Sequence, residues 1–63
     1  MVSRLDPRIR PQSRVLLMVQ GHTALGTVTR IISRKGMTSG TVEVRRDSGF
    51  LGFETGNSLS FLR

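Results

Sequence analysis

The stretch "QGHTALGTVTRII", residues 20–32, contains the strongest fold signal in the sequence. It predicts a strand that ends in a turn at Gly21, followed by a second strand rich in β-branched residues. Gly26 stands inside this second strand, where a glycine normally weakens the hydrogen-bonded ladder, and the apolar residues change phase near Arg30. We therefore predict a bulge or sharp bend near Arg30, with Gly26 as the bending point or at a close approach of another backbone segment.

Strand signals recur on both sides of this stretch, each bounded by turn residues. "VLLMVQ" is apolar on both faces, "TVEVRR" alternates strictly, and short apolar segments flank the "DSG" and "GN" turns. The five predicted strands are residues 15–20, 23–33, 41–46, 50–55 and 58–63. Five short strands joined by tight turns predict an all-β fold, a five-stranded and strongly bent small barrel of the SH3-like or OB-like kind.

The first 14 residues differ in composition from the rest of the chain. They contain both prolines and four arginines, and Asp6-Pro7 is suited to start one helical turn that Pro11 would end. We predict a basic N-terminal arm with at most a short helix, residues 1–14, and a small β-barrel domain, residues 15–63.

The chain is short and strongly basic. A domain of its 63 residues buries only about 60% of the surface of the unfolded chain, and no cysteine is present to cross-link it, so we expect self-association. Ten Lys and Arg residues against four Asp and Glu give a net charge of +6, and nine of the ten cations are arginine. Because the arginine side chain suits phosphates and base edges, this composition indicates a nucleic-acid-binding protein.

Several functional classes lack the residues that they need. One histidine, His22, four scattered carboxylates and no cysteine exclude a structural zinc site, and no serine or carboxylate is spaced as a catalytic partner. No apolar run approaches the ~20 residues of a membrane-spanning helix, and the N-terminus lacks the apolar stretch of a signal peptide. We expect a cytoplasmic binding protein with no catalytic residues, metal, cofactor or membrane contact.

Two stretches resemble the sequence motifs of the Sm and Sm-like proteins, the family that includes bacterial Hfq. In "VLLMVQGHTALGTVTRII" an apolar strand leads to Gly21, and Gly26 opens the next strand, as in the first Sm motif. "GFLGFETGNSLSFL" resembles the second motif, with Gly56 and Asn57 at its turn. The resemblance covers residues 15–62 and implies a bent five-stranded barrel, RNA binding and assembly into a ring.

The resemblance does not extend to the residues that form the uridine-binding pocket of that family. The positions of its aspartate, asparagine and arginine fall at Ile32, near Gly36 and at Thr55 in this chain. The resemblance therefore supports the fold better than it supports a uridine site.

Candidate nucleic-acid-binding residues are the cations of the loops and of the arm. Arg34 and Lys35 lie in the loop where Sm-like rings face nucleic acid, and Arg45 and Arg46 end the next strand. We expect the two pairs to meet at the loop ends and to form a phosphate-binding patch. Three arginines of the arm are expected to add affinity: Arg8, Arg10 and Arg14.

The apolar strand at residues 50–55 is the candidate subunit interface. It is apolar on both faces and contains neither proline nor lysine to block its edge. The resemblance to the Sm-like rings implies that it pairs with the strand at residues 58–62 of a neighbouring subunit, and we expect Leu51, Phe53 and Leu62 in the contact. The three aromatic residues are expected to belong to the core rather than to stack on bases: Phe50, Phe53 and Phe61.

Two functional hypotheses follow from these features. The first is a homo-oligomeric Sm-like ring that binds RNA or another single-stranded nucleic acid. The alternative is an SH3-like interaction or assembly module whose positive charge binds an acidic protein partner. Sequence-specific reading of duplex DNA is not expected, because no candidate helix is available for the major groove.

Overall fold

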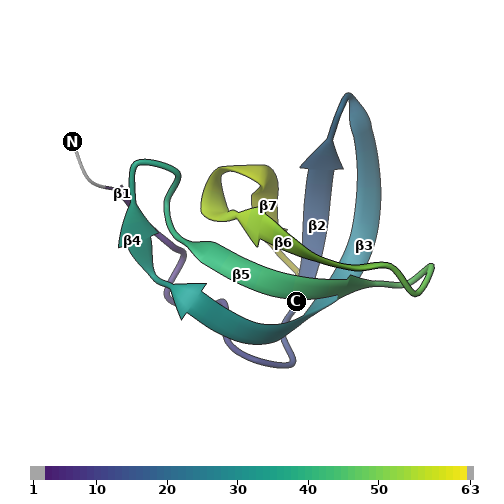
Figure 1. Cartoon of the computed structure of the whole chain (residues 1–63), viewed down its shortest axis with the longest axis horizontal. Coiled ribbons are helices and arrows are strands. Elements are labelled where there is room, and N and C mark those ends of the chain that lie inside the picture. Colours follow the sequence, from purple (N-terminus) through teal and green to yellow (C-terminus); the bar gives the residue numbers. More distant parts are fainter. Residues whose placement is uncertain (1–2, 63) are drawn as a thin grey trace.

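The computed structural model describes residues 3–62 and consists almost entirely of strands (Figure 1). In chain order the elements are β1 (Ser3–Arg4), β2 (Arg14–Val19), β3 (His22–Ser33), β4 (Lys35–Gly36), β5 (Thr41–Arg46), β6 (Leu51–Thr55), the 3-10 turn η1 (Gly56–Ser58) and β7 (Leu59–Phe61). The described residues contain no α-helix. The prediction of an all-β chain with five main strands is confirmed, and the two-residue strands β1 and β4 were not predicted.

The five main strands form one antiparallel sheet in the order β6-β5-β3-β2-β7, and β1 and β4 form a separate two-stranded ladder. The sheet is open, because β6 and β7 lie at its two edges and are joined by η1. The described chain therefore contains an open, bent five-stranded sheet. The finer prediction, that this sheet forms a small barrel, stays a prediction.

β3 is the strand that bends the sheet, as its curved course in Figure 1 shows. The register of its pairing with β5 shifts between Val28 and Arg30, and again between Ile31 and Ser33. The irregularity predicted near Arg30 is confirmed, and such a bulge increases the local twist of a strand.

Gly26 lies in β3 where the end of β5 passes close to it. A Cβ atom at this position would lie 2.6 Å from Val44 Cγ1 and 2.9 Å from the carbonyl oxygen of Arg45. The prediction of a close backbone approach at Gly26 is confirmed, and only a residue without a side chain permits it.

The core lies on the inner face of the bent sheet. Because successive side chains of a strand point to opposite faces, residues two positions apart reach the core together. The buried side chains of the main strands are Val15, Leu17, Val28, Val42 and Val44. β6 contributes no buried residue, so this edge strand is held by its main-chain pairing with β5 rather than by its own core contacts.

The N-terminal segment completes this core. The exposed fractions of Leu5 and Ile9 are 4% and 1%. The Leu5 N–H donates to the carbonyl oxygen of Arg34 over 2.7 Å, and Arg4 is the cross-strand partner of Lys35 in the β1–β4 ladder. The expectation of a separate basic arm is therefore wrong for the described residues. Removal of residues 1–13 is expected to open the core and to destabilise the fold.

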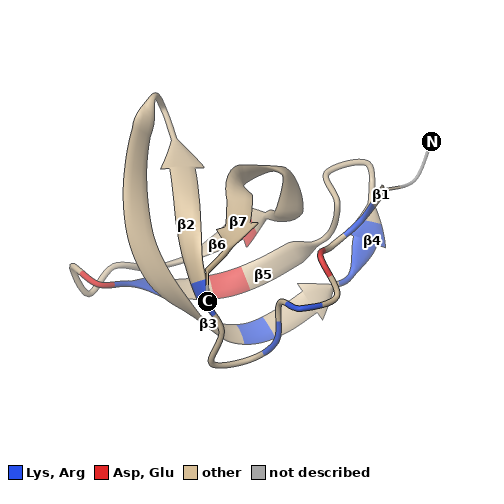
Figure 2. Cartoon of the chain, turned by 180° about the vertical axis from the view of Figure 1, so that it is seen from behind, with Lys and Arg blue, Asp and Glu red and all other residues tan. Residues whose placement is uncertain are grey.

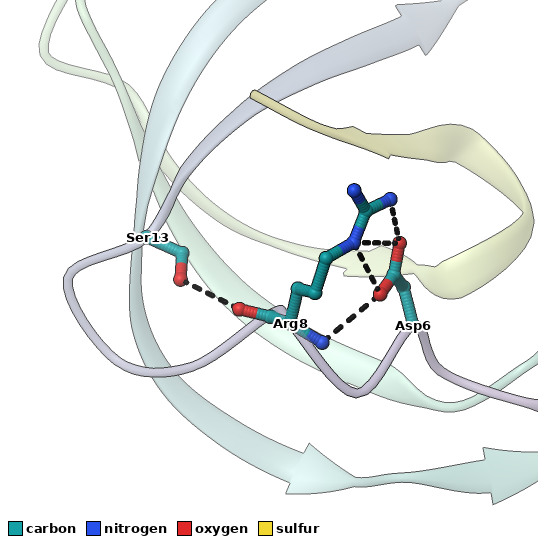
Figure 3. A network of polar contacts seen from close by, with 3 residues as sticks. All are labelled: Asp6, Arg8 and Ser13. Carbon is teal, nitrogen blue, oxygen red and sulfur yellow. Dashed lines mark hydrogen bonds and ion pairs between the residues drawn. The ribbon is translucent and has the colours of Figure 1, made fainter. Parts of the chain in front are cut away.

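A small polar network holds the turn that follows β1 (Figure 3). The Asp6 carboxylate accepts hydrogen bonds from the Arg8 Nη2 over 2.7 Å and from the Arg8 backbone N–H over 2.9 Å. The hydrogen bond from the Arg8 side chain, followed by that from its backbone, lowers the pKa of Asp6. The Ser13 hydroxyl donates to the Arg8 carbonyl oxygen over 3.4 Å, and the Arg8 guanidinium lies 4.6 Å from the centre of the Phe61 ring. Arg8 is thus engaged in folding the N-terminal segment.

Candidate nucleic-acid interface

The predicted loop and strand cations lie at opposite ends of β5. Arg34 and Lys35 follow β3, whose last residue pairs with the first residue of β5. Arg45 and Arg46 are the last two residues of β5. A strand of this length spans roughly 17 Å at about 3.3 Å per residue. The expected meeting of the two pairs in one patch is therefore wrong.

Arg45 and Arg46 also point to opposite faces, because the side-chain period of a strand is two. Arg46 shares the inner face with the core valines, where its guanidinium pairs with Glu54 over 3.2 Å and lies 4.9 Å from the centre of the Phe50 ring. Arg45 is exposed on the outer face and forms no ion pair among residues 3–62. Of these two arginines, Arg45 is the one available to a ligand on the outer face.

Docking of the N-terminal segment places Arg4 opposite Lys35 in the β1–β4 ladder, and Lys35 is next in the chain to Arg34. The Arg34 Nη1 donates to the carbonyl oxygen of Ile9 over 3.1 Å, which holds this guanidinium against the N-terminal segment. None of the three is ion-paired within residues 3–62, and Figure 2 shows blue segments around β1 and β4. We call Arg4, Arg34 and Lys35 the β1–β4 basic patch.

The three arginines predicted in the N-terminal segment have different environments. Arg8 is held by Asp6, as described above, whereas Arg10 is exposed and has no ion-pair partner in the described chain. Arg14 forms a bidentate pair with Asp47, with distances of 2.6 Å from Nη1 to Oδ1 and 2.7 Å from Nη2 to Oδ2. These bonds lower the pKa of Asp47. Arg14 thus links β2 to the β5–β6 turn, and Arg10 is the unpaired cation of the three.

A polar pocket opens on the outer face between the N-terminal segment and strands β3 and β5. It is lined by Gln12, Thr27, Thr29 and Arg45, and its volume is about 270 Å³. The Thr27 hydroxyl accepts a hydrogen bond from the Arg14 Nη1 over 2.9 Å. We call these four lining residues the outer-face pocket. It combines hydrogen-bonding groups with an unpaired positive charge.

Two of the three phenylalanines are exposed, which contradicts the expectation that all three belong to the core. The exposed fraction is 57% for Phe50 and 61% for Phe53, whereas Phe61 is half-buried against the core. Leu51, on the same face of β6 as Phe53, is 52% exposed and is the cross-strand partner of Arg45. An exposed apolar strip, Leu51 and Phe53, therefore lies beside the outer-face pocket.

The predicted interface residues differ in whether their backbone N–H and C=O groups are available for hydrogen bonds to another chain. The Arg46 N–H donates to the Phe50 carbonyl oxygen over 2.7 Å. Because hydrogen-bonded and non-bonded pairs alternate in an antiparallel ladder, the main-chain groups of Leu51 and Phe53 then point to the free edge of β6. Leu62 donates its N–H to β2 over 3.0 Å and is half-buried. Leu51 and Phe53 are thus placed to pair with another chain, and the Leu62 amide is already used.

Four residues of these surfaces were missed by the sequence analysis. Thr27 and Thr29 could have been found from the sequence, since both are polar and lie on either side of the core residue Val28. Alternate residues of a strand point to opposite faces, so these two threonines are expected on the face away from the core. Arg4 was not singled out because nothing in the pattern showed that β1 would pair with β4. Gln12 had no signal, since its place in the pocket depends on a backbone with a φ of 78°.

Comparisons with protein-family models, curated proteins and solved structures found no match to this chain. Within the part of the chain that the structure describes, no helix is long and apolar enough to cross a membrane, and no three His, Asp or Glu residues group together as metal ligands.

Proposed function

We propose that the protein is a small Sm-like barrel that binds RNA or another single-stranded nucleic acid as a ring of identical subunits. The observation that carries this proposal is the β1–β4 basic patch. Folding places Arg4 directly opposite Lys35, and the Arg34 guanidinium is bonded to the Ile9 carbonyl oxygen nearby. No carboxylate is paired to any of the three in the described chain. Like charges opposite one another in a ladder are destabilising, and a polyanion that binds there relieves this repulsion.

The shape of the patch favours a flexible polyanion over a duplex read in its major groove. No helix lies in residues 3–62 that could enter the groove, and the patch lies on a two-residue ladder and the segment that follows it. Contacts from exposed cations to phosphates position a nucleic acid without reading its sequence. We therefore expect low sequence preference and a strong dependence on salt.

The ring form of the proposal is supported by the two free edges of the sheet. β6 and β7 are the edge strands and follow one another in the chain. Pairing of β6 with β7 of the next subunit would be a head-to-tail contact, which closes into a ring when the rotation between subunits permits it. The exposed Leu51 and Phe53 would lose water-exposed apolar surface in or beside that contact.

Nucleic-acid binding is tested by titration with single-stranded RNA, single-stranded DNA and duplex DNA at two salt concentrations. The double variant Arg4→Gln/Lys35→Gln is expected to weaken binding about equally for all sequences and to lower the salt slope by up to about two. The matched control Arg8→Gln/Arg14→Gln removes the same charge from two ion-paired arginines, and its slope is expected to change less. Equal effects in the two variants would refute the role of the patch. A wild type that binds no single strand at low salt would refute the proposed function.

Ring assembly is tested by the mass in solution, measured by light scattering. The wild type is expected to form a species of several subunits, and Leu51→Pro to return it to the 7.0 kDa monomer, because proline removes an edge N–H without breaking the β5–β6 ladder. The control Leu51→Ala keeps that N–H and is expected to remain assembled. A wild type that runs as a monomer with and without RNA would refute the ring.

A second candidate function, an interaction module for an acidic protein partner, would combine the net charge of +6 with apolar contacts from the β2–β3 hairpin. Its exposed face carries Met18 and Leu25, with exposed fractions of 54% and 44%, and residues 15–29 contain no charged side chain. Competition with polyglutamate separates the two candidates. Displacement of RNA only by nucleic acids supports the first, and tighter binding of polyglutamate than of RNA supports the second.

A further inference from the structure

The outer-face pocket has the hydrogen-bonding character of a site for one sugar-phosphate unit. Three of its side chains can donate: the Arg45 guanidinium, the Gln12 amide, and the Thr27 hydroxyl, whose oxygen already accepts from Arg14 and whose proton is therefore left over. Thr29 differs, because its hydroxyl donates to Glu43, over 2.6 Å to Oε1 and 3.1 Å to the carbonyl oxygen. Because its one proton is engaged by Glu43, the Thr29 oxygen can only accept a further hydrogen bond. The pocket thus offers several donors, and Thr29 is the lining side chain that acts only as an acceptor.

The charged side chains around the pocket include one more arginine than carboxylates. Arg14 is paired with Asp47, and Arg30 lies 3.5 Å from Glu43, which Thr29 also holds. Three arginines therefore face two carboxylates on this part of the outer face, and Arg45 is the cation without a partner among residues 3–62. An anion bound at Arg45 meets no unpaired carboxylate in the described chain.

Gln12 reaches the pocket through a backbone conformation that a residue with a side chain rarely adopts. Its φ is 78°, and the conformation is held by the Gln12 N–H, which donates to the Val28 carbonyl oxygen over 2.7 Å, and by the Val28 N–H, which donates to Ser13 over 2.9 Å. Such conformations cost free energy and cluster at binding sites. Here the conformation places a side-chain amide beside Arg45 and the two threonines.

The exposed strip on β6 extends the pocket with an apolar surface. Leu51 is the cross-strand partner of Arg45, and Phe53 is that of Glu43. Both are more than half exposed, so a planar base attached to a sugar-phosphate in the pocket can lie on them.

We propose that Gln12, Thr27 and Arg45 bind a phosphate of single-stranded RNA, that Thr29 accepts a hydrogen bond from the ribose 2′-hydroxyl, and that the base lies on Leu51 and Phe53. This inference rests on the proposed function and names a second contact surface, distinct from the β1–β4 basic patch. It predicts a preference for RNA over DNA, because only RNA has the 2′-hydroxyl donor that Thr29 can accept. The shared chemistry, a ribose phosphate, could also come from a free nucleotide or sugar phosphate, and the test separates these sources.

The polymer arm of the test uses a short single-stranded RNA and its 2′-deoxy counterpart. Arg45→Gln is expected to weaken RNA binding by about tenfold or more, as expected for loss of a hydrogen bond to a charged group. The matched control Arg30→Gln removes the same charge from an arginine already beside Glu43 and is expected to weaken binding less. Thr29→Val is expected to reduce the ratio of RNA to DNA affinity toward one, and Thr29→Ser to retain it. Melting curves of all variants identify any that fail to fold.

The monomer arm uses ribose 5-phosphate and inorganic phosphate, followed by nuclear magnetic resonance. The amide signals of Gln12, Thr27 and Thr29 are expected to shift with ribose 5-phosphate, more weakly with phosphate, and not in Arg45→Gln. Wild-type affinity for ribose 5-phosphate above that for RNA would assign the pocket to a free sugar phosphate instead. If RNA binds but Arg45→Gln and Arg30→Gln act alike, the pocket is wrong while the proposed function stands. If RNA does not bind, the proposed function fails, and with it the assignment of the pocket to RNA.

Discussion

The β2–β3 and β5–β6 hairpins have similar lengths but very different surfaces. Residues 15–29, most of the first hairpin, contain no charged side chain, whereas residues 41–55 contain five. The first hairpin places Val15, Leu17 and Val28 in the core through both of its strands, whereas the second contributes Val42 and Val44 through β5 alone, and β6 places no residue there. The β2–β3 hairpin therefore serves mainly to form the core. The β5–β6 hairpin carries the exposed arginine, the exposed aromatic residues and a free edge, which are the features that the proposals use.

The turns of the two hairpins also differ in their contacts with the rest of the fold. Gln20 and Gly21 have φ values of 49° and 79°, so they form a two-residue turn whose twist matches that of the strands. In the β5–β6 turn, residues 47–49, the Gly49 N–H donates to the Arg46 carbonyl oxygen over 2.8 Å, and Asp47 reaches back to Arg14. The first turn is closed by its own backbone. The second is tied to the rest of the fold by an ion pair.

The largest expected effect is at Gly26, where β3 of the first hairpin pairs closely with the end of β5 of the second. Gly26→Val should leave the chain largely unfolded, because its side chain would collide with the Arg45 carbonyl oxygen. Ordinary overpacking already costs ~1–3 kcal/mol of stability, which is close to the ~3–5 kcal/mol that a core of this size supplies. Gly52→Ala, in β6, is the control, since its Cβ would meet only the movable ring of Phe50. Thermal unfolding followed by circular dichroism measures both. Unchanged melting of Gly26→Val would show that the close approach at β3 is absent in solution.

A smaller effect tests whether the N-terminal segment belongs to the core that the β2–β3 hairpin builds. Ile9→Val should lower the free energy of unfolding by about 0.5–1.5 kcal/mol, because Ile9 is 1% exposed. Ile32→Val makes the same chemical change at a residue that is 49% exposed, and should change stability by less than about 0.5 kcal/mol. Denaturant unfolding of the two variants gives the comparison. Equal effects would mean that residues 1–14 form a free arm after all.

The smallest effect concerns the ion pair that ties the β5–β6 turn to β2. The pKa of Asp47 is lowered by its hydrogen bonds with Arg14, so the folded carboxylate binds protons more weakly than the unfolded one. The stabilisation is fully present above the unfolded pKa of about 3.9, and it is lost as the pH falls through the lowered folded value. Asp47→Asn should therefore lower the melting temperature slightly at neutral pH and reduce its decline in acid. Identical acid profiles of the two proteins would show that this exposed pair does not contribute.

Local sequence signals predicted the strands but not the placement of the N-terminal segment or of the aromatic residues. Alternation and turn chemistry act over a few residues, so the strands, the irregularity near Arg30 and the role of Gly26 followed from them. The prolines and arginines of residues 1–14 indicated an arm, whereas the burial of Leu5 and Ile9 depends on contacts with distant strands. The exposure of Phe50 and Phe53 depends likewise on what lies opposite β6, which no local pattern contains.

The sequence by itself determined an all-β chain, its five main strands and a strong positive charge, because hydrophobic periodicity, turn residues and charge are properties of neighbouring residues. The tertiary structure alone decided which Arg and Lys side chains have no ion-pair partner. Pairing across the sheet engages Arg14 with Asp47 and Arg46 with Glu54, whereas Arg45 is left unpaired within residues 3–62. Such pairings join residues up to 33 positions apart, so their outcome depends on the register of strands that only the folded chain establishes.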